Sequence, residues 1–321
     1  MKLLAAPASL KGVLSPLEAA AFLAAGMRRV DGVEAVEVPV ADGGEGTAAV
    51  IHAAVGGEWR TAVVADPLGR TVAARWLLLE DGTAVVDAAA AIGLPLLQED
   101  ERDPLRATSR GLGELLLATL AAQPTSLLVG VGGTATVDGG VGMRGVLGSW
   151  LHEVPIRVAC DVRNPLLGER GAARVFGPQK GADADDVEEL ELRLAALEEL
   201  VAYRDLPGAG AGGGLGAAFA AMGAELVDGA GIVLDLIRFD EHAREAALVV
   251  TGEGAVDATT FEGKAPGAVL RRCASLGVRC ELFGGIVAEG FTAHALSGRR
   301  ELAGEDLVQL GEELALGFDF A

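Results

Sequence analysis

Leu127–Gly140, with the sequence LLVGVGGTATVDGG, joins a short apolar run to a loop of glycines, threonines and one aspartate. Four other apolar runs also end in polar or glycine-rich loops, at Leu3–Pro7, Val36–Val40, Arg157–Cys160 and Ala247–Val250. Continuous apolar runs separated by helical patterns are typical of strands buried on both faces of a parallel sheet. Because ligands bind outside the carboxyl ends of such strands, we expect an active site in the loops that follow these runs.

A different pattern begins after Thr61 and predicts a second domain. Residues 63–72 and 73–88 each read as a hairpin, which implies antiparallel pairing. The sequence therefore predicts an α/β protein with a mostly parallel, Rossmann-like domain, residues 1–62 and 246–321. An inserted α/β domain with antiparallel hairpins is expected at residues 63–245. We expect the active site in the cleft between the two domains.

Helices are expected between the strands. Ser15-Pro16-Leu17-Glu18 is a capping box with proline at the first helical position, and it opens a helix that runs through Arg29. Further helices are predicted at Thr47–Val55, Ser109–Ala122, Asp183–Tyr203, Leu215–Met222 and Gly267–Leu276.

The composition narrows the class of protein. The 321-residue chain is 50% hydrophobic and has a formal net charge of −20. Nucleic acids and anionic membranes are bound by Lys/Arg-rich surfaces, so the charge argues against both as partners. Cys160, Cys273 and Cys280 are scattered without metal-ligand spacing, which is typical of a reduced compartment. No stretch approaches the roughly 20 apolar residues of a membrane span. We expect a cytoplasmic protein that acts on a small molecule.

Two glycine-rich loops and one lysine are candidate anion sites. Gly132–Gly140 can present backbone N–H groups and threonine hydroxyls to an anion, and the alternative is a tight turn that needs glycine for positive φ. Gly208–Gly216 contains G-x-G-x-x-G but follows no strand, which argues against a dinucleotide fingerprint. A phosphate site at a helix N-terminus and close helix packing both remain open for it. Lys264 precedes a helix that Pro266 begins, and it reads either as a phosphate ligand or as a solvent-exposed lysine.

Six carboxylates lie in the loops after the apolar runs: Asp42, Glu45, Asp138, Asp161, Glu253 and Asp257. Phosphoryl transfer requires oxygen ligands for Mg²⁺ and a carboxylate that orients the acceptor hydroxyl. Any one of these carboxylates alone is more often structural than catalytic. Their shared position after strands favours a phosphotransferase.

In chain order, the motifs resemble those of the glycerate kinase family, bacterial type I. The likeness lies in residues 6–12, 39–46, 107–109, 113–115, 131–140, 159–168, 176–182, 207–216 and 251–266. These segments span nearly the whole chain. The resemblance implies a kinase of two α/β domains that uses ATP and Mg²⁺ to phosphorylate a hydroxyl of glycerate, giving phosphoglycerate.

Within this implied reaction, we assign roles from the chemistry of each group. The triphosphate is assigned to Gly132, Gly133, Thr134, Thr136, Gly210, Gly212 and Gly213, with Lys264 also on phosphate. Mg²⁺ is assigned to Glu253 and Asp257. Glycerate is assigned to Ser9, Lys11, Glu45 and Asn164, and Lys11 is also assigned to catalysis. Either Asp42 or Asp161 orients the attacking hydroxyl.

The chain departs from the family pattern at five positions. It has Ala8 for aspartate, Leu10 for phenylalanine, Val137 for asparagine, Ala255 for arginine and Glu262 for a basic residue. These losses leave a second function open, a catalytically impaired relative that binds nucleotide or a small hydroxy acid as a sensor or partner subunit. The sequence also leaves open whether the protein is a homodimer.

Overall fold

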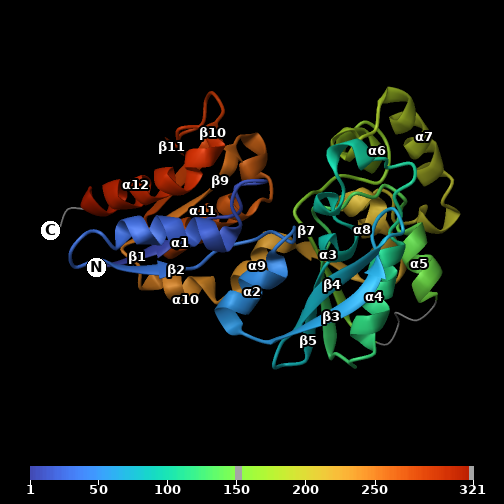
Figure 1. The fold of residues 1–321 in the computed structure, drawn as a ribbon, viewed down its shortest axis with the longest axis horizontal. Helices are drawn as coiled ribbons and strands as arrows, with labels where there is room; N and C mark the ends of the chain where they lie inside the picture. Colours follow the sequence, from blue (N-terminus) through green and yellow to red (C-terminus); the bar gives the residue numbers. More distant parts are fainter. Residues whose placement is uncertain (149–153, 318–321) are drawn as a thin grey trace. The chain divides into compact units, whose positions relative to one another are not determined.

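The computed structural model describes residues 1–148 and 154–317 and divides the chain into two compact units. Unit 1 comprises Met1–Asp42, Ala49–Val55 and Ala230–Ala321, and unit 2 comprises Gly43–Ala48 and Gly56–Gly229. Each unit has its own β-sheet, shown with its helices in Figure 1. The expected α/β class, with one parallel sheet and one sheet that contains antiparallel pairs, is confirmed.

Unit 1 is built on a parallel five-stranded sheet with the order β11-β10-β9-β1-β2. The strands are β1 (Lys2–Ala5), β2 (Glu34–Glu37), β9 (Leu248–Val256), β10 (Cys280–Val287) and β11 (His294–Ala295). The helices are α1 (Pro16–Met27), α2 (Thr47–Val55, shared with unit 2), α9 (Gly229–Leu236), α10 (Phe239–Arg244), α11 (Ala265–Leu276) and α12 (Ala303–Leu316). The described residues of this unit also form the short 3₁₀ turns η6 (Ala258–Phe261) and η7 (Arg300–Leu302).

Helices α1 and α12 pack side by side, and one buried cluster joins them to the sheet (Figure 1). In this cluster Leu3 of β1 packs with Leu23 of α1 and Leu307 of α12. The capping box expected at Ser15 is confirmed, because its side chain accepts a hydrogen bond from the Glu18 amide and the Glu18 carboxylate accepts one from the Ser15 amide.

Unit 2 is built on a six-stranded sheet with the order β3-β4-β5-β6-β7-β8. Strands β3, β4 and β5 pair antiparallel, which confirms the expected hairpins, and β5 to β8 pair in parallel. The strands are β3 (Glu58–Ala65), β4 (Thr71–Leu78), β5 (Thr83–Asp87), β6 (Ser126–Gly130), β7 (Ile156–Cys160) and β8 (Glu225–Asp228). The helices are α3 (Ala89–Ile92), α4 (Arg110–Leu120), α5 (Val141–Leu147), α6 (Ala172–Phe176), α7 (Ala184–Ala195) and α8 (Ala211–Ala221). Its 3₁₀ turns are η1 (Leu94–Leu96), η2 (Glu99–Glu101), η4 (Pro178–Lys180) and η5 (Glu198–Leu200).

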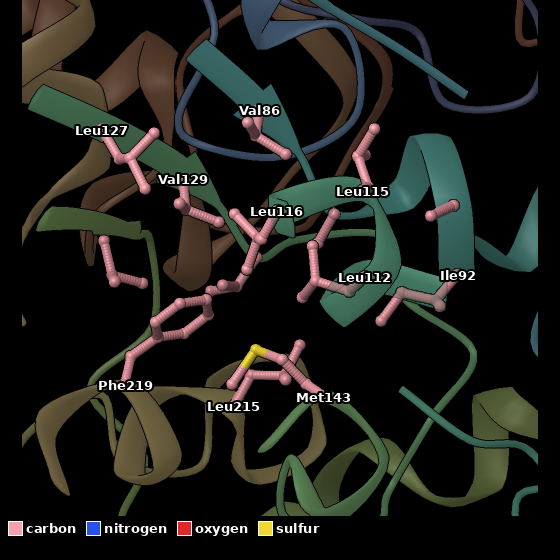
Figure 2. Packing of buried hydrophobic residues seen from close by; sticks show 14 of the residues in the cluster. Val86, Ile92, Leu112, Leu115, Leu116, Leu127, Val129, Met143, Leu215 and Phe219 are labelled. Atoms are coloured by element: carbon pink, nitrogen blue, oxygen red, sulfur yellow. The ribbon is translucent and has the colours of Figure 1, made fainter. Parts of the chain in front are cut away.

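The main core of unit 2 lies between its sheet and helices α4, α5 and α8 (Figure 2). Val86 of β5 and Val129 of β6 converge there with Leu116 of α4, Met143 of α5 and Phe219 of α8, all fully buried. Burial of a side chain of this size contributes about 1.5–3 kcal/mol. The core therefore fixes the ends of β5 and β6, from which the loops of the candidate site extend.

Two expected element boundaries are wrong. The apolar run Ala247–Val250 does not end its strand, because β10 pairs with β9 as far as Val256. Thr251–Gly254 is therefore strand rather than loop. The helix expected over Asp183–Tyr203 ends at Ala195, since the backbone of Leu197 leaves the helical region at φ −78° and ψ 86°.

Within residues 1–148 and 154–317, no helix combines the length and apolarity that crossing a membrane requires. Cys160, Cys273 and Cys280 are all free thiols.

Candidate functional site

Lys11 lies in a tight turn that follows β1 in unit 1, and Ser9 immediately precedes this turn. Two backbone hydrogen bonds of 3.0 Å between the ends of Leu10–Leu14 close this turn, and Lys11 is exposed within it. The amide of Ala8 donates to the carbonyl oxygen of Gly252 in β9 over 2.9 Å. The turn is therefore tied to the strand that carries the next group of polar side chains.

Glu253 is the centre of that group. Its Oε1 accepts from the Thr260 hydroxyl at 2.7 Å, and its Oε2 forms an ion pair with Lys264 Nζ at 3.2 Å. Burial raises the pKa of Glu253, the contacts with Thr260 and Lys264 oppose this shift, and the charge of Asp42 raises the pKa further. Unit 1 thus brings Asp42, Glu253 and Lys264 into one electrostatically coupled group.

Glu253 and Asp257, the two residues expected to bind Mg²⁺, both make other contacts in the structure. Asp257 caps η6, where its Oδ1 accepts from the amide of Thr259 at 2.8 Å and from its hydroxyl at 2.5 Å. Both oxygens of Glu253 accept from protein donors. Among the described residues, no group of three or more His, Cys, Asp or Glu could hold a metal ion. The residues present therefore fit Mg²⁺ only in its common mode, one or two carboxylates together with substrate phosphates.

In unit 2, the segment Gly43–Ala48 contacts the carboxyl ends of β5 and β6 and carries the exposed Glu45. Asp87, the last residue of β5, accepts from the amide of Gly46 at 3.1 Å and from that of Ala48 at 3.2 and 3.3 Å. Burial raises the pKa of Asp87 to about 7 against the effect of these amides, and the charge of Glu45 adds to the rise. The sheet of unit 2 thereby fixes the backbone on which Glu45 lies.

The loop after β6 uses part of its backbone internally. The Gly132 amide donates to the carbonyl oxygen of Gly43 at 3.2 Å, and the Ala135 amide donates to that of Ile92 at 2.8 Å. The Gly132 amide is therefore engaged within the protein. The side chains of Thr134 and Thr136 are buried, and in the described part of the chain Thr136 Oγ1 has no hydrogen-bond partner. The anion role of Gly133, Thr134 and Thr136 stays a prediction.

The glycines of the second loop pack against the first loop. Gly212 and Gly213 have positive φ values of 61° and 73°, and the Gly213 carbonyl oxygen accepts from the Gly139 amide at 3.1 Å. A Cβ on Gly213 would lie 1.9 Å from the carbonyl oxygen of Thr136, so only glycine permits this approach. The amide of Gly210 donates to the backbone oxygen of Asn164 at 2.9 Å. Close packing is therefore what the structure shows for these glycines, and their contact with phosphate stays a prediction.

Asp161 and Asn164 follow β7, also in unit 2. Asp161 is partly exposed, and burial, together with the charge of Asp161, raises the pKa of Cys160 to about 12. The side-chain amide of Asn164 donates to the carbonyl oxygen of Arg170 at 2.8 Å. This contact braces its own loop, and the expected contact with glycerate stays a prediction.

Asp138, a further carboxylate of the first loop, is held by structural contacts. Its Oδ2 accepts from the amide and the hydroxyl of Ser109, each at 2.8 Å, and its carboxylate also accepts from the amides of Gly140 and Gly142 at 3.1 and 3.2 Å. The carboxylate ties α4 to the start of α5.

Sequence reasoning missed two charged residues of unit 2. Asp87 directly follows the apolar residues Val85 and Val86, but the sequence pattern predicts only a hairpin over residues 73–88 and gives Asp87 no role. Lys180 lies in the motif of residues 176–182 without an assigned role, and its side chain is only 4% exposed. Only the structure shows that Lys180 reaches the loop after β6.

Comparisons with known proteins point to one family. The model of the glycerate kinase family matches residues 3–153 and 147–303. The "Glycerate 2-kinase" of Escherichia coli (strain K12) is 42% identical over 83% of this chain and 80% of its own length. The "Glycerate kinase" of Bacillus subtilis (strain 168) is 40% identical over 87% of this chain and 83% of its own length. The solved structure described as "Crystal structure of putative glycerate kinase 2 from Salmonella typhimurium LT2" matches with a TM-score of 0.81 and 34% identity, covering 98% of this chain and 97% of that chain.

Proposed function

The chain belongs to the glycerate kinase family, and on this premise we propose that it transfers the γ-phosphoryl group of ATP to a hydroxyl of glycerate, giving phosphoglycerate. The observation that carries this proposal is the ion pair of Glu253, in β9, with Lys264, together with the charge of Asp42 acting on the same carboxylate. Carboxylates beside a lysine suit a reaction that moves a proton from a hydroxyl and neutralises phosphate charge.

In unit 1, the proposed roles concern glycerate and the phosphates. Ser9 and Lys11 bind the glycerate carboxylate, because a hydroxyl and an exposed ammonium lie at the start of one fixed turn. Asp42 accepts the proton of the attacking hydroxyl. The oxygen of this hydroxyl forms a bond to the γ-phosphorus, and the bond between this phosphorus and ADP breaks. Lys264 binds phosphate, and its 3.2 Å ion pair with Glu253 holds the lysine near the site until phosphate and Mg²⁺ bind.

In unit 2, the proposed roles are binding and orientation. The amides and hydroxyls of the loop after β6 bind the triphosphate, and Gly208–Gly216 supports that loop. Glu45 and Asn164 are proposed to contact glycerate, and Asp161 is the alternative to Asp42 as the hydroxyl-orienting carboxylate. Such positioning supplies most of the catalysis in phosphoryl transfer.

Mg²⁺ bound with the phosphates would neutralise the negative charge that develops on them. Glu253 and Asp257 are the proposed protein oxygens for it. Lys264 already lies against Glu253 and Thr259 against Asp257, so metal binding there requires that these contacts change.

An assay that couples ADP release to a spectroscopic signal tests the proposal with ATP, Mg²⁺ and D-glycerate, and ³¹P NMR of the product identifies the phosphorylated hydroxyl. We expect turnover that needs all three components. We expect D42N or D161N to lower kcat by about 100-fold or more, as loss of a catalytic proton acceptor does. D205N is the matched control, because the Asp205 side chain is 90% exposed. ATP binding without turnover would refute the kinase assignment.

The second candidate is a catalytically impaired relative that acts as a sensor or partner subunit. The structure around three positions that depart from the family pattern bears on this candidate. Val137 is buried in an apolar cluster with Leu166 and Leu194, so core packing accounts for its side chain. Ala8, by contrast, lies buried after β1 beside β9, and Ala255 is exposed on β9 itself. These two positions favour the second candidate, and the turnover assay separates it from the first.

A further inference from the structure

Two phenylalanine rings stack at the surface of unit 1, close in sequence to Lys264. The ring centroids of Phe261 and Phe291 lie 5.7 Å apart, and the ring planes are 13° from parallel. Phe261 is 43% exposed, although only 4% of the chain is aromatic and phenylalanines such as Phe239 and Phe283 are fully buried. Stacked rings form a flat apolar surface that can accept a further ring, which a single surface phenylalanine does not offer.

The short turn that carries Phe261 has a fixed backbone. Asp257 caps η6, and Nη1 of Arg271 in α11 donates to the carbonyl oxygen of Phe261 at 3.1 Å. A Cβ on Gly267 would lie 2.1 Å from the carbonyl oxygen of Thr260, so only glycine lets α11 pack this closely on η6. The turn therefore presents the Phe261 side chain from one position.

The loop that carries Phe291 is tied to the ends of β9 and β10. The Phe291 amide donates to the carbonyl oxygen of Ala288 at 3.3 Å, and the Ala288 amide donates to that of Val256 at 2.9 Å. Ile286 of β10 is 66% exposed and pairs in register with Ala255 of β9, which is also exposed. The carboxyl ends of these two strands therefore carry apolar side chains that the described protein leaves open.

A cation suited to phosphate lies close to the stacked rings. Phe261 and Lys264 are three residues apart, so their Cα atoms lie within about 11 Å of each other. The Thr260 hydroxyl and Lys264 Nζ contact the two oxygens of the same carboxylate, Glu253. Lys264 also precedes α11, a 12-residue helix whose N-terminus favours an anion. Aromatic rings beside a phosphate cation match the two ends of a nucleotide, which are a flat base and a polyphosphate.

We propose that the Phe261–Phe291 pair binds the adenine ring of the nucleotide by stacking, with Lys264 on the phosphates. Every nucleobase has a π face, so stacking supplies affinity without a hydrogen-bonding partner for the base. A stable protein interface needs about 800 Å² from each partner, whereas even a fully buried phenylalanine covers only about 150–250 Å². The exposed rings therefore suit a small planar ligand. This inference deepens the proposed kinase function and rests on it for the identity of the nucleotide.

Isothermal titration calorimetry with ADP and with inorganic tripolyphosphate, which has no base, tests the proposal. We expect F261A to weaken ADP binding about 5- to 100-fold and to leave tripolyphosphate binding unchanged. F291A removes the supporting ring and should weaken ADP binding about 2- to 10-fold. F261W keeps a π face and should retain the affinity for ADP. F22A is the matched control, because Phe22 of α1 is 40% exposed, and it should change neither affinity.

A measurement on the wild-type protein avoids any effect of a variant on folding. We expect NOEs between adenine H2 or H8 and phenylalanine ring protons at saturating ADP, and their absence would overturn the proposal. Equal losses of ADP affinity in F261A and F22A, or equal losses for ADP and tripolyphosphate in F261A, would also overturn it. So would a changed oligomeric state of F261A in light scattering with unaltered ADP affinity, which would make the rings a protein–protein contact.

Failure of the proposed function gives a different result from failure of this inference. If wild-type protein bound ADP in a manner that depends on Phe261 but showed no turnover with D-glycerate, the kinase function alone would be wrong. If wild-type protein turned over ATP and D-glycerate while F261A kept its full affinity for ADP, the base-binding role of the rings alone would be wrong.

Discussion

Asp87 accepts hydrogen bonds from the backbone amide of Ala48 with both carboxylate oxygens, at 3.2 and 3.3 Å. The Gly46 amide adds a third contact at 3.1 Å. A strand end of unit 2 thus fixes a segment that the chain forms 39 residues earlier. The same segment carries Glu45, so the position of one proposed glycerate contact depends on a partly buried carboxylate.

The first prediction concerns the pH dependence of stability at Asp87. Burial raises its pKa from the ordinary 3.8 to about 7. Between these values the folded protein binds the proton more tightly than the unfolded chain, so the stability from this group is complete below pH 3.8 and is lost as pH rises through about 7. The loss is on the order of 4 kcal/mol at most. D87N has no proton to lose at this position. The Tm of D87N relative to that of the wild type should therefore rise as the pH increases from 5 to 8. Parallel Tm profiles of the two proteins would contradict the raised pKa.

The second prediction concerns the ion pair of Glu253 and Lys264. K264M removes a charge that opposes the raised pKa of Glu253, so this pKa should rise further. We expect kcat/KM for ATP to fall at least about 10-fold and the acid limb of the pH–rate profile to move to higher pH. K2M removes an equal charge remote from this group and serves as the control. If the acid limb did not move in K264M, Glu253 would not be the group whose ionisation controls the rate at low pH.

The third prediction concerns Asp138 and Ser109. Four hydrogen bonds converge on this carboxylate, so D138A should lower the free energy of unfolding by about 2–4 kcal/mol. S109A removes the hydroxyl that donates to Asp138 and accepts from the buried Met143 amide at 2.9 Å, so it should cost about 1–3 kcal/mol. In urea unfolding, the double variant should be less destabilised than the sum of the single variants, because the two residues share a bond. Strict additivity would show that the 2.8 Å contact contributes nothing.

The fourth prediction concerns Ala8, where the family pattern has aspartate. The proposed mechanism uses Asp42 or Asp161 for the hydroxyl, so A8D should change kcat by less than about 10-fold. Steady-state kinetics with D-glycerate measure this, and A8N controls for the added volume at a buried position. A gain above about 100-fold in A8D alone would instead show that the natural chain is a catalytically impaired relative.

Local patterns predicted much of the fold because the signals act over short range. The capping box at Ser15 and the hairpin around residues 66–70 depend on neighbouring residues, and both are confirmed. The end of β9 could not be predicted, since it depends on β10, which pairs with Thr251–Val256 from about 30 residues later in the chain. Glycines at Gly252 and Gly254 look like a loop in sequence although they lie in a strand.

The sequence predicts which residue types form the candidate site, but not which contacts their side chains make. Strand-end carboxylates and Lys264 were found, and the structure groups Asp42, Glu253 and Lys264. The side-chain contacts of Asn164 and Asp257 with their own loops were not foreseeable, because they depend on loop geometry. Lys180 was missed for the opposite reason, since a lysine is normally exposed and only tertiary structure shows its burial.

The last prediction tests whether the second glycine loop positions the first one. G213A places a Cβ 1.9 Å from the carbonyl oxygen of Thr136 at a φ of 73°, so it forces Thr136 to move as well as straining its own backbone. G223A has a similar φ of 83° but meets nothing within 4 Å, and it isolates the cost of backbone strain. We expect G223A to cost about 1 kcal/mol, with an unchanged KM for ATP. G213A should cost at least about 2 kcal/mol more and raise the KM for ATP, because the loop after β6, to which the triphosphate is assigned, loses its arrangement. If both variants raised the KM equally, the effect would come from general destabilisation rather than from contact between the two loops.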